Sequence, residues 1–385
     1  MSLNDLPDIC LWKIFENVHE AKELIRLSKV CSRWSDLITP RFNRVKYLQM
    51  IYITKPCKYG CEKKVDYIDA NSLWMNEYTN WNDYNLFQLF PNLKIIDASA
   101  LLGSSSYNSP EIVKNNPQIK GLVIWDDFEN SYDFANIEMF AAVFDFDYKK
   151  VFRPDQLKQV YCDFLDMNDV PSFIEYFPNL KRLHIKPDKA NGVFYNGPNL
   201  SSLKILEFVV GQFVEQFTGF HFMDFCPSLE SVFFTCWAKD LYVNESIKNY
   251  NLRDLVVGSI PSRSYPWPLF KKLLSKFPNL HHLAIRHFFK FDDSSLRELI
   301  NLLPELKILD LRVFSRKVYK KAEKAFLSKY CVKENRSIVI YYNCENEPTE
   351  WPKLVDTYEP ICYGFDFMKH CFYKQFSYLP NLIDE

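Results

Sequence analysis

The sequence has little glycine and no long apolar run. Nine of its 385 residues are glycine, and no glycine-rich phosphate loop is present, which argues against a nucleotide-dependent enzyme. No segment approaches the ~20 consecutive apolar residues of a membrane helix. The N-terminus also lacks the charged stretch, apolar run and small-residue cleavage site of a signal peptide. We therefore expect a cytoplasmic and/or nuclear protein that does not act at a membrane.

An excess of charge and an ordered set of cysteines are missing as well. The net charge of −1 gives no general attraction to nucleic acid, so we expect no nucleic-acid partner. The eleven cysteines are irregularly spaced. Cys57 and Cys61 have a spacing that zinc could use, but a structural site normally needs four ligands. We expect reduced thiols and no cofactor.

Aromatic residues are abundant instead. The chain has 33 Phe, 23 Tyr and 8 Trp, and 48% of its residues are apolar, so it can bury a large core. Its length leaves room for two domains. No Ser-His-Asp, Cys-His or paired-carboxylate arrangement stands out from spacing alone, and we expect no catalytic site.

Three short helices are predicted in the first forty residues. Apolar residues recur at the helical spacing of three to four between Leu6 and Val18. A second run covers Ala21 to Val30, and a third begins near Ser32. Because a unit of roughly 40 residues rarely folds alone, we expect this block to dock on the rest of the chain or on another protein.

The block resembles the F-box motif in order and spacing. The resemblance rests on Leu6-Pro7, Lys13-Ile14-Phe15, Leu24-Ile25-Arg26-Leu27 and Val30-Cys31-Ser32-Arg33-Trp34. Two positions depart from the usual pattern: Ile9 stands where an acidic residue is common, and Trp12 where an aliphatic one is. The motif covers about a tenth of the chain, and we assign residues 1–42 to it.

The resemblance implies that the block binds a Skp-type adaptor and, through it, a cullin-RING ubiquitin ligase. Eight residues are expected to form or support this surface: Leu6, Pro7, Ile14, Phe15, Leu24, Leu27, Val30 and Trp34. Some of them must instead fill the core of the small block, and the sequence does not divide the two sets. The alternative is a helical cap that only closes the following domain.

A repeated phrase runs through the rest of the chain. FPNL occurs at 90–93, 177–180 and 277–280, and weaker copies occur elsewhere. Each is part of an apolar triplet spaced LxxLxL, and nine triplets start at Leu93, Ile119, Leu157, Leu180, Leu203, Leu229, Leu252, Leu280 and Leu306. Seven of the eight steps between them fall within the 20–29 residues of a leucine-rich repeat.

These repeats resemble the leucine-rich-repeat solenoid. That resemblance implies an α/β fold: a three-helix F-box, then a curved solenoid with parallel strands on the concave face and helices outside. We assign 43–88 to a linker or degenerate first repeat and 89–343 to the solenoid, with an insertion at about 126–148. Residues 336–343 are expected to add a strand and 344–385 to cap the end. The regular asparagine after each strand is absent.

The concave face would hold a target protein. Alternate strand residues should point toward it, and those chosen as target-binding are Trp125, Tyr161, Asp163, His184, Glu207, Phe233, Trp237, Asp254, His282, Arg286 and Arg312. Aromatic and arginine side chains are typical anchors of interfaces. Alternatively, the C-terminal tail or the insertion covers these side chains and they are internal packing.

Together these features predict a non-catalytic substrate receptor of an SCF-type ubiquitin ligase. A ubiquitin-independent interaction scaffold, with the N-terminal block as a cap, is the alternative. A receptor for a small polyphosphate is third, because Arg182, Lys186, Arg286 and Arg312 lie on three strands of which only the last two are adjacent. The identity of the target cannot be read from the sequence.

Overall fold

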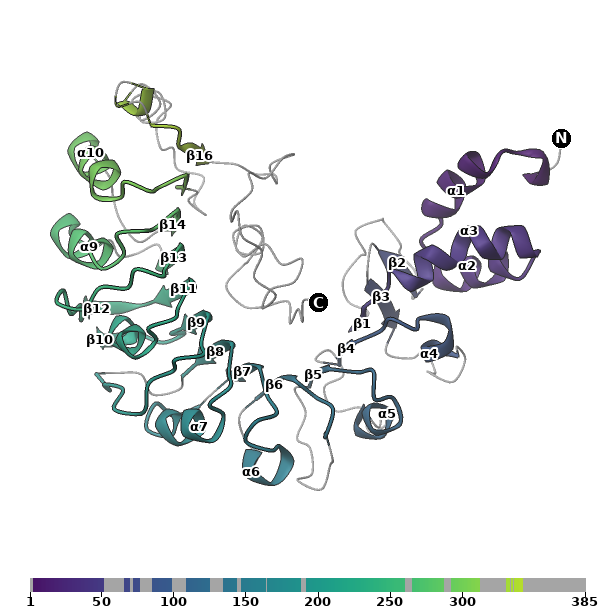
Figure 1. The fold of residues 1–385 in the computed structure, drawn as a ribbon, viewed down its shortest axis with the longest axis horizontal. Helices are drawn as coiled ribbons and strands as arrows, with labels where there is room; N and C mark the ends of the chain where they lie inside the picture. Colours follow the sequence, from purple (N-terminus) through teal and green to yellow (C-terminus); the bar gives the residue numbers. More distant parts are fainter. Residues whose placement is uncertain are drawn as a thin grey trace. The chain divides into compact units, whose positions relative to one another are not determined.

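The computed structural model places the chain in two compact units, Met1–Gln156 and Leu157–Glu385. Figure 1 shows the elements, and each unit is described by itself. The structure describes residues 3–51, 66–69, 72–76, 85–98, 109–124, 134–143, 147–163, 165–187, 192–259, 265–286, 292–311, 330–332, 334 and 336–341.

The first unit begins with the three expected helices. A short 3-10 turn, η1 (Leu3–Asp5), precedes α1 (Asp8–Glu16), α2 (Ala21–Ser28) and α3 (Ser32–Asn43). The apolar positions of each helix face the other two: Leu11, Leu24 and Ile38 are almost completely buried. The prediction of three N-terminal helices is therefore confirmed.

A sheet follows in the same unit. Its strands lie in the order β6-β5-β4-β1-β3-β2, and each pairing is parallel except that of β2 with β3. The strands are β1 (Tyr47–Ile51), β2 (Tyr67–Asp69), β3 (Ser72–Asn76), β4 (Ile95–Asp97), β5 (Gly121–Val123) and β6 (Met139–Val143). Three short helices accompany them: α4 (Leu86–Leu89), α5 (Ser109–Asn115) and α6 (Tyr148–Val151).

Strand β6 changes the interpretation of the segment predicted as an insertion at about 126–148. Its described residues do not form only an outer loop, because β6 pairs in register with β5. Ile137, Phe140 and Ala142 occupy the triplet positions and are buried. The sequence analysis missed this strand because its triplet contains no leucine.

The second unit is a parallel sheet with the order β16-β15-β14-β13-β11-β9-β8-β7. Its strands are β7 (Gln159–Asp163), β8 (Arg182–Lys186), β9 (Ile205–Val209), β11 (Ser231–Cys236), β13 (Asp254–Ser259), β14 (His282–Arg286), β15 (Ile308–Asp310) and β16 (Val339–Tyr341). The predicted triplets pair in one register, so that Leu183 lies opposite both Val160 and Leu206. The parallel strands and the strand expected within 336–343 are confirmed.

Helices cover one face of this sheet. Figure 1 shows α7 (Val170–Tyr176), α9 (Trp267–Leu274) and α10 (Asp293–Leu302) on the same side of it. The triplet residues Leu183 and Ile185 are fully buried, and successive side chains of a strand point to opposite faces. The residues between them therefore lie on the other face, which we call the helix-free face.

The residue before the first leucine of a triplet links three of the turns in the second unit. Its side chain donates a hydrogen bond to a backbone carbonyl of the preceding turn. Asn279 donates to the Tyr250 carbonyl (2.9 Å), Asn251 to Pro227 (2.8 Å) and Ser202 to Pro178 (2.5 Å). These side-chain bonds, which we call the turn ladder, lie before the strands, whereas the regular asparagine after each strand is absent from the sequence.

The start of α10 is fixed by a capping box between Asp292 and Ser295. Ser295 and Glu298 have capping-box spacing, but the N-cap is Asp292, whose carboxylate accepts from the backbone N–H of Ser295 at 2.7 Å. The Ser295 hydroxyl accepts from the backbone N–H of Asp292 at 3.0 Å, which completes a capping box, and it donates to the Asp292 carbonyl at 3.0 Å. Glu298 instead binds Trp267 and Lys271 of α9.

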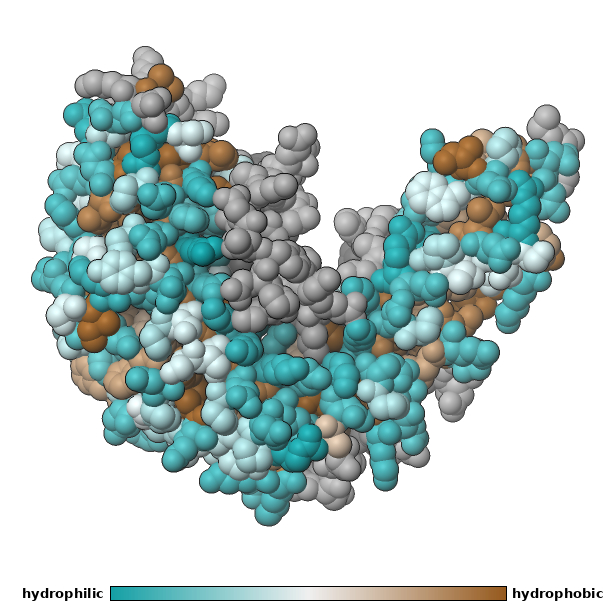
Figure 2. Space-filling model, in the orientation of Figure 1, coloured by the Kyte–Doolittle hydropathy of each residue, from teal (hydrophilic) through white to brown (hydrophobic). Residues whose placement is uncertain are grey.

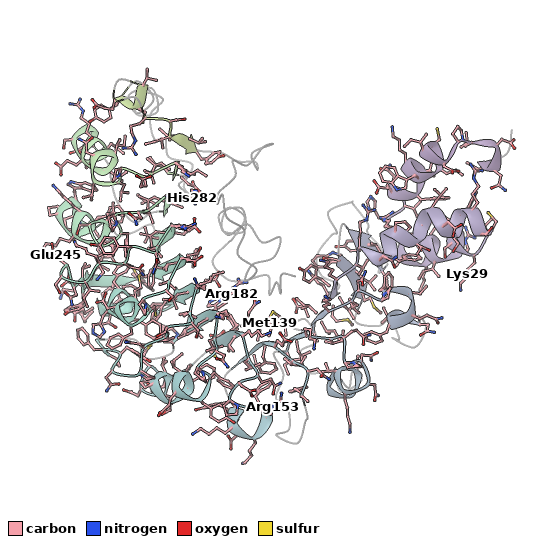
Figure 3. The ribbon with its side chains drawn as sticks, viewed as in Figure 1. Lys29, Met139, Arg153, Arg182, Glu245 and His282 are labelled. Atoms are coloured by element: carbon pink, nitrogen blue, oxygen red, sulfur yellow. The ribbon has the colours of Figure 1, made fainter. Side chains whose placement is uncertain are left out.

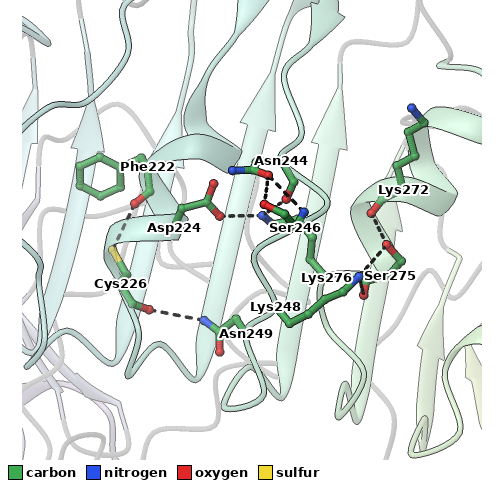
Figure 4. A network of polar contacts seen from close by, with 10 residues as sticks. All are labelled: Phe222, Asp224, Cys226, Asn244, Ser246, Lys248, Asn249, Lys272, Ser275 and Lys276. Carbon is green, nitrogen blue, oxygen red and sulfur yellow. Dashed lines mark hydrogen bonds and ion pairs between the residues drawn. The ribbon is translucent and has the colours of Figure 1, made fainter.

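Two further strands and a helix-free segment break the regular pattern. β10 (Val214–Phe217) and β12 (Ala238–Leu241) form a separate parallel pair, with α8 (Gly219–Phe222) and η3 (Met223–Phe225) after β10. Residues 242–253, between β12 and β13, contain no helix. The segment is held by polar contacts instead: the Lys276 ammonium binds the Asp224 carboxylate and the Asn244 carbonyl, both at 2.6 Å (Figure 4).

Candidate functional site

An aromatic pair forms the centre of the N-terminal block. The rings of Phe15 and Trp34 meet edge to face at 5.2 Å, and both side chains are buried together with Leu24. These three residues were predicted as adaptor-binding or supporting, and their side chains lie inside the block. Replacing Trp34 would therefore test folding more than binding.

The side chain of Arg33 fixes the segment before α1. Arg33 donates to the Asp8 carboxylate at 2.8 Å and to the backbone carbonyls of Asn4 and Leu6, each at 2.6 Å. The guanidinium presents several donors in a fixed planar geometry, so one side chain orients three consecutive parts of the segment. The Leu6-Pro7 turn is therefore held in place on the surface of the block.

Arg41 connects the block with the sheet of the same unit. It is 6% exposed and donates to the carbonyl of Phe15, to that of Val18 at 2.7 Å and to that of Ile68 in β2 at 3.2 Å. Nearby, the backbone N–H of Ala21 donates to the Asp66 carbonyl at 2.9 Å. The block thus packs on the β2 end of the sheet.

The remaining predicted adaptor-binding residues lie at the surface. Ile14 is 41% exposed and Val30 55%, Pro7 is also exposed, and Leu6 and Leu27 are half-buried. The structure thus divides the eight predicted residues into buried and more exposed side chains, a division that the sequence did not allow. Whether the exposed set binds an adaptor stays a prediction.

Three exposed apolar residues were missed by the sequence analysis. Leu3, Ile9 and Trp12 are 55%, 60% and 37% exposed. Ile9 and Trp12 are three residues apart and share a face of α1, whereas Ile14 lies on another side. Figure 2 shows hydrophobic atoms exposed among hydrophilic ones over η1 and α1. For Ile9 and Trp12, the departure from the usual motif pattern was the available signal, whereas Leu3 had none.

Most predicted target-binding residues are buried. They lie on the helix-free face of the second unit, as Figure 3 shows for His282, with Arg182 beside the set. The buried ones are Tyr161, Asp163, His184, Glu207, Phe233, Asp254 and His282. The expectation that Tyr161 and Phe233 are exposed is wrong, because both side chains are buried.

The other four positions have different outcomes. Trp125 and Arg312 lie outside the described residues, and of Arg286 only the backbone, in β14, is described. Trp237 is half-buried and meets the ring of Phe213 edge to face at 5.8 Å. Phe213, 39% exposed, was not predicted, because it follows a strand and falls outside the triplets.

The buried polar residues of the helix-free face bind one another across neighbouring strands. Ser231 donates to Asp254 at 2.5 Å, and the Nδ1 of His282 contacts the other oxygen of that carboxylate. Between β7 and β8, the Lys186 ammonium binds Asp163 at 3.0 Å. Burying a charge is costly unless it is paired, and this pairing lets the strands carry charges in the interior.

Cysteines and potential metal ligands occur in the described part of the chain. Among those residues no group of three or more His, Cys, Asp and Glu could hold a metal. Burial raises the pKa of Cys162 and Cys226, and that of Cys236 to about 12, so these thiols stay protonated at neutral pH. No described helix is long and apolar enough to cross a membrane.

Comparison with known protein families gives a match that covers the N-terminal block. Residues 3–44 match the F-box-like family model, and this range ends one residue after α3. The N-terminal block is therefore an F-box-like domain, the kind of domain that binds Skp-type adaptors in cullin-RING ligases. No curated protein matches the chain.

Proposed function

We propose that the protein is a non-catalytic substrate receptor of an SCF-type ubiquitin ligase. The F-box-like domain at residues 3–44 carries the proposal. Its support is a rigid three-helix block that exposes Pro7, Ile14 and Val30 while keeping Phe15 and Trp34 inside. Exposed apolar side chains on a fixed frame are suited to a protein interface.

The strands and helices that follow the F-box-like domain are proposed to form leucine-rich repeats that hold the target. The in-register parallel strands and the turn ladder of Ser202, Asn251 and Asn279 support this interpretation. Trp237, with Phe213 beside it, is the most accessible of the predicted target-binding side chains that the structure describes. Function then follows from positioning: two binding surfaces on one chain raise the effective concentration of a target lysine near the conjugating enzyme.

A pull-down with purified Skp-type adaptor tests the proposal. The full chain is compared with Ile14→Asp/Val30→Asp and with Ile9→Asp/Trp12→Asp. Tyr250→Asp is the matched control, because Tyr250 is 63% exposed in the second unit. We expect the first variant to lose at least about tenfold in affinity, and the control to bind like the wild type.

Each variant must keep its thermal transition for the comparison to count. Loss in the Ile9/Trp12 variant as well would extend the adaptor surface over the second face of α1. If the intact chain does not bind the adaptor, the ligase proposal is wrong.

The scaffold alternative has one observation in its favour. Arg41 and Ala21 tie the block to β2 and to Asp66, as a cap on the sheet would require. A chain that ignores the adaptor but unfolds when the block is weakened would support this second function. Capping and adaptor binding use different faces, so a positive pull-down decides for the ligase.

A further inference from the structure

The ring of His221 joins two segments of the second unit that contain no helix. It meets the rings of Phe194 and Tyr242 edge to face, with centroids 5.0 and 5.8 Å away, and those two rings meet each other at 4.8 Å. Phe194 belongs to residues 192–204, between β8 and β9, and Tyr242 begins the helix-free segment 242–253. We call the three rings the aromatic cluster. Because Phe194 is 42% exposed, the cluster lies at the surface.

Two polar atoms next to the cluster lack a hydrogen bond. The Nδ1 of His221 and the Oδ2 of Asp224 are buried, and neither has a partner within the described part of the chain. The other carboxylate oxygen of Asp224 binds the Lys276 ammonium at 2.6 Å. A protonated imidazole carries an N–H on both nitrogens, so protonation of His221 would place an unpaired donor at the buried Nδ1. A buried donor without an acceptor costs free energy.

The charged groups around the ring of His221 come from two other elements. Asp224 lies in η3 and Lys276 follows α9, whereas the two helix-free segments contribute the phenyl ring of Phe194 and the phenol ring of Tyr242. Burial lowers the pKa of His221; Asp224 raises this pKa by less, and Lys276 lowers it further. The ring of His221 is therefore neutral at pH 7.

The direction of the pH response follows from this lowered pKa. A base whose pKa is lowered by folding takes up its proton more readily in the unfolded chain. The stability that comes from the neutral ring is complete above the unfolded pKa of about 6.5 and is lost as the pH falls through the folded-state pKa. Acid therefore favours conformations in which the ring of His221 reaches water.

We propose that His221 is a pH switch of the second unit: its neutral ring holds Phe194 and Tyr242 together, and its protonation releases the two segments to which they belong. The release is local, because β8, β9 and β11 stay paired in register without any contribution from this ring. Segments of this kind open separately from the core strands of a protein. Mild acid would thus expose aromatic side chains that contact one another at neutral pH.

Asp224 titrates with the opposite effect on stability. Burial raises the pKa of its carboxyl, while Lys276 and then His221 lower it. Protonation of Asp224 therefore favours the folded state as the pH falls. A variant of His221 is needed to separate the contributions of the two groups.

Hydrogen exchange of the full chain, read by mass spectrometry at about pH 7.5 and about pH 5, tests the switch over the range in which histidine titrates. Each exchange rate is divided by the intrinsic rate of the unfolded chain at that pH. We expect the protection of residues 192–200 and 242–250 to be at least about threefold lower at the lower pH. The protection of β8 should stay the same.

The test variant is His221→Phe, which keeps a ring in the cluster that cannot be protonated. It should show no loss of protection at the lower pH. His281→Phe is the matched control: burial also lowers the pKa of His281, but this half-buried ring precedes β14 and lies outside the cluster. The control should respond to pH like the wild type.

A second variant keeps the outcome clear. If His221→Phe does not fold, His221→Gln replaces it, because a glutamine side chain is neutral at both pH values. The proposal is wrong if the two wild-type segments keep their protection at the lower pH, or if the His221 variant loses as much as the wild type. It is also wrong if β8 loses protection in parallel, because the cause is then global unfolding, or if His281→Phe abolishes the response.

Discussion

Lys276 forms an almost completely buried ion pair with Asp224, and their side chains are 1% and 4% exposed. Lys276 lies two residues after the end of α9, and Asp224 lies in η3. The ion pair therefore joins residues on either side, in sequence, of the helix-free segment 242–253 (Figure 4). Removing one member of a buried pair leaves an uncompensated charge, which costs far more than the pair itself contributes. The Lys276 side chain therefore helps to hold the segment 242–253 in place, where no helix is present.

Lys276→Met is expected to lower the free energy of unfolding by about 3–5 kcal/mol at pH 7. Urea denaturation of the full chain measures the loss. Lys272→Met is the control: its partner is Glu245 and both side chains are about half exposed, so the loss should stay below about 1 kcal/mol. Equal losses in the two variants would contradict the assigned role of burial.

The loss should also depend on pH. Burial raises the pKa of the Asp224 carboxyl, against the lowering influence of Lys276 and then His221. When folding raises the pKa of a carboxyl group, its protonated form stabilises the folded state. That stabilisation is present at low pH and is lost as the pH rises through the folded-state pKa. Without Lys276 the pKa rises further, so Lys276→Met should cost less near pH 4 than at pH 7.

At the residue scale, the sequence predicted which residue types form the N-terminal block, but not which of their side chains are exposed. Of the eight adaptor residues, Phe15, Leu24 and Trp34 are core and Val30 is surface, although all eight belong to one motif. A motif records which residue types are needed at which spacing. It does not record whether an apolar side chain meets a neighbouring helix or a partner, and in a block this small the two sets alternate along the same helices.

Gly219 at the start of α8 illustrates how tightly single elements pack. A Cβ at this position would overlap the ring of Phe217 and lie 2.9 Å from that of Phe234. Both rings are almost completely buried, and an interior at close-packed density has no room to shift them. Here glycine is required by space rather than by backbone conformation.

Gly219→Ala is expected to lower the free energy of unfolding by about 1–3 kcal/mol. Gly211→Ala provides the comparison, because its Cβ would meet only the Cε of Lys186 at an ordinary 3.6 Å. Chemical denaturation of both variants measures the difference. A Gly219→Ala protein as stable as Gly211→Ala would show that the Phe217 ring can move away.

Strands were predictable at the element scale and helices less so. The LxxLxL triplets fix the strands because alternation defines the buried side. The segment 242–253 gives no such signal: it contains Asn244, Asn249 and Asn251, whose side chains form turns and bind Cys226 and Pro227. Polar bonds take the place of a helix there, and no hydrophobic period marks them.

The first unit should behave as one cooperative body, because Arg41 joins the F-box-like block to β2. In hydrogen exchange, amides of α1 to α3 should be protected to nearly the same extent as those of β1 and β4. Arg41→Met should lower protection in the block by about 3 kcal/mol and uncouple the two. Arg44→Met, whose guanidinium is 52% exposed and pairs with Glu16, should leave the pattern unchanged.

At the scale of the whole molecule, periodicity predicted the parallel sheets but not the burial of the side chains on their helix-free face. The residues between the triplet positions were expected at a surface, whereas Glu207, Phe233 and His282 are completely buried. Alternation says that two sides of a strand differ. It does not say that the second side is exposed, and the charged residues there misled because they are paired in the interior.

The turn ladder of Ser202, Asn251 and Asn279 joins three pairs of neighbouring turns in the same way, since each bond ends on a backbone carbonyl and needs no particular neighbouring side chain. Gene duplication or loss of one phrase-to-phrase segment would therefore bring together two ends that already fit. The length of such a chain is free to change by whole units during evolution, while the chemistry at each junction stays the same.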